Sequence, residues 1–366
     1  MRAIQVVNVR WFNATVWYGL YLAKLMSEAG HEVLALTLPG TESHEKALEW
    51  GIETRCLPLN SAGPLTAFRL YRELSGLVHD FRPDVINCHR GESFYLFGLL
   101  RKRLGGFKLV RTRGDQRPPR NDPANRWLHG NCADAVVATN SAMARHFRKN
   151  FGLCEPRLAT IIGGVDRERF AFDPAGRERV RREFGYDQND FVVGLMGRFD
   201  EVKGQREAIR AVAALRGKTG RMRVKLMLLG FESATSEAEV RRWIAEAGAG
   251  ELVAITGLRD DVPACVSAMD LGLVASKWSE TIARAALEIM SCGVPLVGTR
   301  VGVMPDLLDD GALLAPGDVE DTAAIIRRAA MDADFRALLG ERQSERMSEL
   351  GARDFLLKTL SLYRSI

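Results

Sequence analysis

Short apolar runs alternate with amphipathic helical stretches along the first half of the chain, which restricts the fold to a parallel α/β architecture. Strands of such a sheet bury both faces, so each reads as a short, continuous, β-branched run. These runs predict strands at residues 3–8, 31–37, 84–88, 108–112 and 134–138. The stretches between them predict helices at 16–29, 64–81, 92–103 and 141–150, the last with Ser141 as its N-cap.

The alternation begins again after residues 162–174, which are rich in glycine, proline and charge. Strands of this second series are predicted at 191–196, 224–229, 252–256, 271–275 and 295–298. A chain of 366 residues with 46% hydrophobic content is long for one core. We therefore expect two Rossmann-like, doubly wound parallel-sheet domains. Their predicted extents are 1–165 and 166–345, followed by a C-terminal helix, 346–366, that packs across both domains and so returns to the first.

Composition excludes several other classes of protein. No uncharged run is longer than residues 11–23, which are fewer than the roughly 20 apolar residues of a membrane span. Residues 3–9 are too short and too polar for a secretory signal, so we expect a cytoplasmic protein. The six cysteines show neither CxxC nor metal-ligand spacing, and we expect buried thiols.

Positive charge is concentrated in the first half of the chain. Residues 1–166 carry a formal charge of +7, whereas residues 167–366 carry −2. Nine cations and two acids lie between Arg101 and Arg126. This density suits an anionic acceptor, an anionic membrane surface or nucleic acid, and it equally suits an ordinary solvated surface.

The strand at 191–196 runs into the loop GRFDEVKG, which ends where a helix is predicted from residue 205. Arg198 and Lys203 therefore lie at a helix N-terminus, where the helix dipole disfavours cations, and a bound diphosphate would compensate them. Gly197 and Gly204 would let the backbone approach that ligand closely. Alternatively, the two cations pair with the loop's own acids, Asp200 and Glu201.

Two glutamates follow the strand at 271–275. Glu280 is predicted to lie at the start of a helix, where it could be a capping acid or could contact a ligand. Glu288 lies two turns further on in the apolar stretch IARAALEIM, where a carboxylate needs hydrogen-bond donors. Ribose hydroxyls are donors of that kind.

The chain resembles glycosyltransferase family 4, whose members are retaining enzymes of the GT-B fold. The resemblance rests on Glu280 and Glu288 with the intervening spacing of seven residues, on the following CGVP turn and on the preceding GRFDEVKG loop. Further similar segments are AGHEVLALT (29–37), DVINCH (84–89), GGVDRERF (163–170), TGLRDDV (256–262) and APGDVEDTAAII (315–326).

The resemblance implies a nucleoside-diphosphate sugar donor, expected to be a UDP-sugar, held by the second domain. Arg198 and Lys203 would contact the diphosphate, Glu288 the ribose, and Glu280 the sugar and distal phosphate, together with the backbone N–H groups of Thr281 and Ile282. The implied donor-binding residues are Gly197, Arg198, Lys203, Arg259, Glu280, Thr281, Ile282 and Glu288, of which Glu280, Arg198 and Lys203 are also implied in catalysis.

The implied reaction is direct transfer with retained anomeric configuration, without a protein nucleophile, a cofactor or a metal. The string Asp332-Ala333-Asp334 matches the D-x-D pattern of metal-dependent transferases. It falls in a predicted helical region and not after a strand, so we expect no metal site there.

The first domain departs from the family pattern, and its acceptor-side candidates are correspondingly less regular. The first strand is followed by no Gly-Gly pair, so Asn13-Ala14 is its expected counterpart, with Arg10 and Trp11 shaping the acceptor site. Where relatives often have a histidine, this chain has Arg113-Gly114-Asp115. His89 follows its strand directly and could contact a hydroxyl or be a structural, hydrogen-bonded histidine.

We expect a saccharide or lipid-linked acceptor, in lipopolysaccharide or other bacterial surface glycan synthesis, with peripheral contact to an anionic membrane and no nucleic-acid partner. The alternatives are a GT-B nucleotide-sugar epimerase or hydrolase and a non-catalytic nucleotide-sugar-binding protein. A dehydrogenase is disfavoured because no glycine follows the first strand before Gly19.

Overall fold

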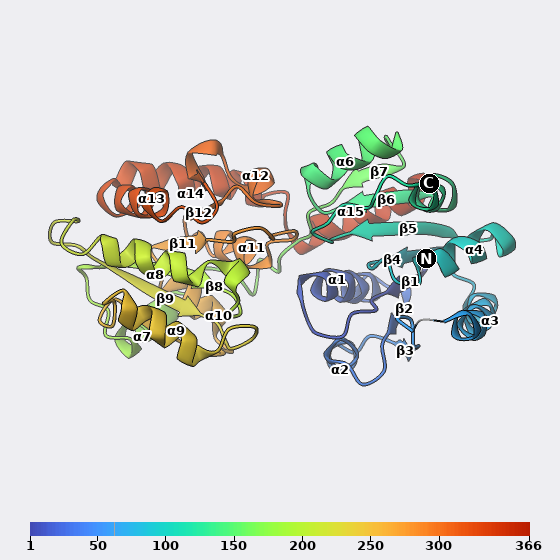
Figure 1. The fold of residues 1–366 in the computed structure, drawn as a ribbon, viewed down its shortest axis with the longest axis horizontal. Coiled ribbons are helices and arrows are strands. Elements are labelled where there is room, and N and C mark those ends of the chain that lie inside the picture. The colour runs from blue at the N-terminus through green and yellow to red at the C-terminus, as the bar shows by residue number, and fades with distance from the viewer. Residues whose placement is uncertain (62) are drawn as a thin grey trace. The chain divides into compact units, whose positions relative to one another are not determined.

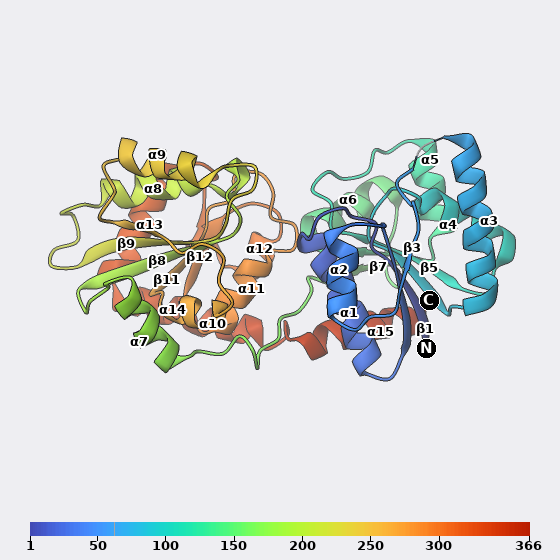
Figure 2. The same ribbon diagram turned by 90° about the horizontal axis from the view of Figure 1, so that it is seen from below.

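The computed structural model describes residues 1–61 and 63–366, which form two compact units (Figures 1 and 2). Unit 1 comprises Met1–Gly163 together with Ala352–Ile366, and unit 2 comprises Gly164–Gly351. No helix among the described residues is long and apolar enough to cross a membrane.

In the described part of unit 1, seven parallel strands form one sheet in the order β3-β2-β1-β4-β5-β6-β7. In this order the chain first winds outward from β1 and then crosses to β4 on its other side, as in doubly wound sheets. The strands are β1 (Arg2–Val6), β2 (Glu32–Thr37), β3 (Thr54–Cys56), β4 (Val85–Cys88), β5 (Lys108–Arg113), β6 (Ala135–Ala138) and β7 (Leu158–Thr160).

Helices cover both faces of this sheet, as Figure 2 shows, with α1 and α15 on one face and α3 and α4 on the other. Side chains of β1 alternate between the two: Ile4 and Val6 belong to the core beneath α3 and α4, while Gln5 faces Met26 of α1 and Tyr363 of α15. The helices are α1 (Ala14–Glu28), α2 (Glu42–Glu49), α3 (Pro64–Phe81), α4 (Phe94–Leu104), α5 (Pro123–Arg126), α6 (Ser141–Phe151) and α15 (Ala352–Ser365), with a π-helical turn η1 (Trp127–Cys132).

Unit 2 repeats this architecture with six described parallel strands in the order β10-β9-β8-β11-β12-β13. Figure 2 shows α8, α9 and α13 on one face of the sheet and α7, α10 and α11 on the other. The strands are β8 (Asp190–Met196), β9 (Arg223–Leu229), β10 (Val253–Ile255), β11 (Leu271–Val274), β12 (Leu296–Thr299) and β13 (Leu313–Leu314). The helices are α7 (Pro174–Glu183), α8 (Gln205–Ala214), α9 (Glu237–Glu246), α10 (Val262–Ser267), α11 (Arg284–Ser291), α12 (Met304–Leu307), α13 (Val319–Met331) and α14 (Ala333–Met347), with 3₁₀ turns η2 (Glu201–Lys203) and η3 (Asp310–Ala312).

The C-terminal region differs from the single helix expected at 346–366. The helix α14 ends at Met347 within unit 2, and α15 begins at Ala352 within unit 1, because the intervening backbone turns and pairs with the opposite connection. Val165 N donates to Leu350 O at 3.0 Å, and Val165 forms a parallel bridge with Gly351. The two connections between the units are therefore hydrogen-bonded to each other.

Two smaller differences concern local structure. Asn140, not Ser141, is the N-cap of α6, because its side-chain oxygen accepts from Met143 N at 2.9 Å. The sequence did not predict the short strands β3, β7 and β13, which have two or three residues each. Strands of that length are too short to show a periodic pattern.

Candidate donor and acceptor sites

In unit 2, the sheet order reverses between β8 and β11, which are neighbouring parallel strands. Ligands of open α/β sheets bind at the carboxyl ends of the strands, where two adjacent connections leave in opposite directions. The loops that follow β8 and β11 are residues 197–204 and 275–283, the two segments that the sequence singled out. The strand order thus brings both loops to the same edge of the sheet, at the carboxyl ends of β8 and β11.

The loop after β8 is fixed by close backbone contact with the loop after β11. Gly204 has φ +72°, and a Cβ there would lie 2.1 Å from Ala275 O, so no other residue fits without displacing the backbone. Lys277 N donates to Val202 O at 2.8 Å. Asp200 caps the 3₁₀ turn η2 through Val202 N at 3.1 Å. Lys203 consequently projects from a defined turn.

Glu280 is the centre of this site. Its carboxylate oxygen Oε2 accepts from Lys203 Nζ at 2.7 Å and from Ser276 Oγ at 2.5 Å, and the residue is only 7% exposed. Its backbone carbonyl accepts from Val303 N at 2.8 Å. The carbonyl passes so close to Gly302 that a Cβ there would lie 1.9 Å from it. Both ends of Glu280 are therefore held in place.

Arg198 pairs with an acid of its own loop, the alternative considered for this segment. Its NH2 and Nε contact Asp200 Oδ2 at 2.6 and 3.1 Å, yet the side chain remains 40% exposed. Lys203 pairs with Glu280 and Glu201 pairs with Lys277, so the alternative that both cations pair with acids of their own loop holds for Arg198 and not for Lys203. The two cations thus have one carboxylate each.

Glu280 does not cap a helix, which corrects the capping alternative. The helix α11 begins at Arg284, four residues later, and its N-cap position is Ala283 with φ +50° and no side-chain cap hydrogen bond. Positive φ is unfavourable for alanine, and such strain clusters at functional sites. Thr281 is half-buried and Ile282 is buried between Glu280 and this helix start.

Glu288 is 4% exposed and lies inside α11. Burial raises the pKa of its carboxyl group, while Arg284, whose Nε donates to Oε1 at 2.5 Å, and the more distant charge of Arg169 lower it. The sequence indicated that this carboxylate needs hydrogen-bond donors, and Arg284 is one such donor within the chain.

Arg259 pairs with acids other than Glu280. Its guanidinium donates to Glu183 at 2.6 and 3.0 Å and to Asp261 at 2.8 and 3.0 Å, which occupies four of its five N–H groups. These hydrogen bonds raise the pKa of Arg259 further. Arg259 thus links its loop to α7, and one N–H group of its guanidinium remains for the expected donor contact.

In unit 1, the loop after β1 leads into α1 as the sequence suggested. Asn13 is the N-cap of α1, accepting from Thr15 N and Val16 N at 3.0 and 3.1 Å, and Ala14 is the first helical residue. Arg10 is exposed and Trp11 is 57% exposed. This loop offers polar and aromatic surface at the carboxyl end of β1.

His89 is fully buried, so the structure does not present it to a ligand. Its Nε2 lies 2.8 Å from Gln5 Oε1, and its ring packs against Tyr18. Burial, followed by the charge of Arg111, lowers the pKa of His89 to about 3, which keeps the ring neutral at pH 7. This geometry is that of the structural histidine considered as the alternative.

Arg113 is also mostly buried, with its side chain 9% exposed, and Gly114 follows it in the backbone. Arg113 and two further arginines, Arg90 and Arg111, gather around Asp115, a residue to which the sequence analysis assigned no role. The sequence does contain a sign of this grouping. The two arginines of RTRGD occupy alternate positions of a buried strand, so their side chains point to the same side of the sheet.

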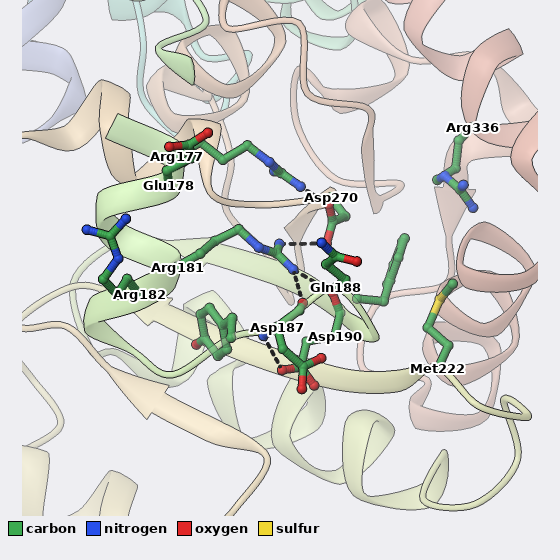
Figure 3. Close-up of a pocket in the computed structure, with 12 residues that line it drawn as sticks. Arg177, Glu178, Arg181, Arg182, Asp187, Gln188, Asp190, Met222, Asp270 and Arg336 are labelled. Atoms are coloured by element: carbon green, nitrogen blue, oxygen red, sulfur yellow. Dashed lines mark hydrogen bonds and ion pairs between the residues drawn. The ribbon is translucent and has the colours of Figure 1, made fainter. Parts of the chain in front are cut away.

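A cavity of about 660 Å³ lies elsewhere in unit 2, near the amino ends of β8 and β11 (Figure 3). Asp270, which precedes β11, accepts from Arg177 at 2.6 Å and from Arg181 at 3.1 Å. Because these residues pair with one another at the edge opposite to the 197–204 loop, the cavity is part of a structural ion-pair network.

No group of three or more His, Cys, Asp or Glu side chains that could hold a metal ion occurs among the described residues. Asp332 of the Asp332-Ala333-Asp334 string is the N-cap of α14, accepting from Phe335 N at 2.9 Å.

Comparison with known proteins agrees with this geometry. Residues 16–169 match the family described as Glycosyltransferase Family 4, and residues 190–332 match Glycosyl transferases group 1. The chain belongs to glycosyltransferase family 4. The fold is accordingly GT-B, and the protein is a glycosyltransferase.

Two curated relatives and one solved structure illustrate the membership. The D-inositol 3-phosphate glycosyltransferase of Pseudarthrobacter chlorophenolicus is 29% identical over 77% of this chain and 72% of its own. The 2-deoxystreptamine glucosyltransferase of Streptomyces kanamyceticus is 28% identical over 63% of this chain, and the match spans only 59% of that enzyme. The crystal structure of Anabaena HepE in complex with UDP matches with a TM-score of 0.86 and 20% identity, covering all of both chains.

Proposed function

We propose that this family 4 glycosyltransferase transfers a sugar from a nucleoside-diphosphate sugar, with UDP as the expected nucleotide, to a hydroxyl group of an acceptor held by unit 1. The observation that carries the donor assignment is the Lys203–Glu280–Ser276 cluster at the point where the sheet order of unit 2 reverses. A cation and a carboxylate side by side suit a ligand that has a diphosphate next to a polyhydroxylated ring.

The donor would be divided among the two loops and α11. Lys203 and Arg198 would bind the diphosphate, aided by backbone N–H groups at the start of α11. Glu280 would accept hydrogen bonds from sugar hydroxyls, and Glu288 from the ribose. Gly197, Thr281 and Ile282 would contribute backbone contacts.

The proposed reaction retains the anomeric configuration and needs no metal. The bond between the anomeric carbon and the phosphate oxygen breaks as the acceptor oxygen forms its bond to the same face of that carbon. The acceptor proton passes to an oxygen of the leaving diphosphate. Charge that develops on that leaving group would be stabilised by Arg198 and Lys203, which are positioned before the reaction.

The acceptor is proposed to be a saccharide, a lipid-linked saccharide or a small polyol. Named relatives act on D-inositol 3-phosphate and on 2-deoxystreptamine, both polyhydroxylated rings. A role in lipopolysaccharide or other surface glycan synthesis, at the inner face of the membrane, stays a prediction that rests mostly on the family resemblance, with support from the basic charge of residues 1–166.

Calorimetric titration with UDP tests the donor site. Lys203→Ala and Arg198→Ala should each weaken UDP binding by about 1.5–3 kcal/mol, the scale of a charge-assisted hydrogen bond. Glu239→Ala, on α9 of the same unit, is the control, because this side chain is 41% exposed and pairs with Arg242 of its own helix. Equal UDP affinity in all three variants would refute the assignment.

Incubation of the donor without an acceptor separates the alternatives. An epimerase or hydrolase would consume UDP-sugar at its full rate, whereas a transferase requires the acceptor, and a binding protein would consume none.

A further inference from the structure

Three arginines of unit 1 converge on one carboxylate where β4 and β5 end. Asp115 forms ion pairs with Arg111 at 2.8 Å, Arg113 at 3.1 Å and Arg90 at 3.5 Å. Arg90 is the second residue after β4, and the other two arginines belong to the end of the neighbouring strand β5. We call these four residues the arginine cluster.

The arginine cluster holds more positive than negative charge. Asp115 is shared by all three cations, and among the described residues one further acid, Glu92, pairs with Arg90 at 2.6 Å. The side chains of Arg111 and Arg113 are 0% and 9% exposed. Burying guanidinium groups that share one anion destabilises the fold. Burial, and then repulsion by Arg111, lowers the pKa of Arg113 to about 10.

The surrounding groups do not supply the missing negative charge. His89 and His129 are buried, and burial lowers their pKa values to about 3 and about 4, so both rings are neutral at pH 7. The Cys88 thiol is buried with its pKa raised to about 12, so it is also neutral. An external anion is therefore the simplest remaining source.

Donor groups of the arginine cluster are left over for such an anion. The Nε atoms of Arg111 and Arg113 have no hydrogen-bond partner among the described residues. The cluster opens to solvent through Arg90, which is 34% exposed, and Asp115, which is 20% exposed. It lies at the carboxyl end of the sheet, next to the β1–β4 reversal where doubly wound sheets bind ligands.

We propose that the arginine cluster binds a phosphate ester group of the acceptor. The proposal rests on the proposed function, because it assigns a chemical group to the acceptor of that reaction. A phosphate ester brings more than one negative charge and several acceptor oxygens, which match the planar N–H forks of two guanidinium groups. Asp115 orders the arginines before the phosphate arrives.

Titration with inorganic phosphate, followed by thermal unfolding in the presence of saturating UDP, tests this site. Phosphate should stabilise the wild-type protein, and Arg90→Gln and Arg113→Gln should each weaken phosphate binding about tenfold or more. Asp115→Asn should bind phosphate more tightly than wild type, since it removes the competing internal anion. Arg69→Gln, on an exposed position of α3, is the matched control.

A purely structural cluster gives a different result. In that case Asp115→Asn and the arginine variants lower the unfolding temperature, and phosphate stabilises none of the proteins or stabilises all of them equally. Either outcome overturns the proposal. If Arg113→Gln does not fold, Arg90→Gln alone decides, because this side chain is on the exposed side of the cluster.

Two probes distinguish the source of the phosphate ester. D-inositol 3-phosphate represents a soluble polyol phosphate, and farnesyl diphosphate represents a lipid carrier. Competition with phosphate by one of them supports the proposal and identifies the source, whereas tighter binding of unphosphorylated inositol than of its phosphate overturns it. Repeating the titration with Lys203→Ala separates this test from the donor assignment. That variant changes unit 2 and should leave the phosphate response of unit 1 intact.

Discussion

Replacing Glu280 by glutamine tests the centre of the donor site most directly. Glu280→Gln keeps the size of the side chain and removes its charge, so Lys203 loses its ion-pair partner while its own side chain is 23% exposed. Glu280 also accepts from Ser276 and is almost fully buried. Loss of these charge-assisted hydrogen bonds should lower the free energy of unfolding by about 1.5–3 kcal/mol.

The functional effect should be larger than the effect on stability. Free UDP lacks the sugar that Glu280 would contact, so the UDP dissociation constant should change by less than about threefold, whereas kcat should fall by about two orders of magnitude, the scale of one lost transition-state contact. Glu288→Gln should show the opposite pattern and weaken UDP itself, because the ribose is common to all forms of the donor.

Three assays on the same variants decide the matter: urea unfolding, UDP calorimetry and initial rates. Glu201→Gln is the matched control, since its side chain is 72% exposed and its ion pair with Lys277 should contribute at most about 1 kcal/mol. If Glu280→Gln turns over at the wild-type rate, or if it loses UDP affinity as Glu288→Gln does, the proposed division of roles is wrong.

Three further predictions concern other parts of the structure. Ala283→Gly should leave stability unchanged or raise it by up to about 1 kcal/mol, because it relieves positive φ, whereas Ala285→Gly, inside α11, should cost about 1 kcal/mol; urea unfolding of both measures the contrast. The folded-state pKa of His89 is lowered to about 3, whereas the unfolded chain protonates this ring near pH 6.5. Below pH 6.5, His89 therefore lowers the free energy of unfolding by about 1.4 kcal/mol for each pH unit, and above pH 6.5 it has no such effect. Between pH 6.5 and 5, the free energy of unfolding of His89→Gln should therefore fall by about 2 kcal/mol less than that of the wild type, as measured by urea unfolding. Equal falls in the two proteins would place the histidine in a solvated environment. Transferase activity should survive EDTA and dialysis, whereas loss that manganese restores would revive Asp332 and Asp334 as ligands.

The sequence predicted the fold well where strands and helices are long enough to show their period. The helix at 64–81 agrees with α3 at both ends, and the strands at 191–196 and 224–229 agree with β8 and β9 to within a residue. The apolar pattern could not show the turn between α14 and α15, because apolar residues recur at helical spacing in both segments and the break is set by pairing with Val165, almost two hundred residues earlier.

For the candidate sites, the sequence identified the loops but not the partners. Lys203 and Glu280 were assigned separately, and only the strand order shows that they form one pair. The burial of His89 and the engagement of Arg259 depend on packing across elements, which spacing along the chain does not encode. No role was predicted for Asp115, because a single acid in a basic segment resembles an ordinary surface residue until its three partners are placed.

The return of α15 to unit 1 affects the order in which the protein can mature during synthesis. All of unit 2 leaves the ribosome before residues 352–366 do, so the first 163 residues must wait for a segment that is made after the whole of unit 2. Until then, Asn87 and Gln5 lack the Tyr363 hydroxyl, which accepts from them at 2.8 and 3.5 Å. Nascent chains that end before α15 would expose Gln5, Asn87 and the surface of α1 that α15 covers. Chaperones and proteases can recognise such exposed surface.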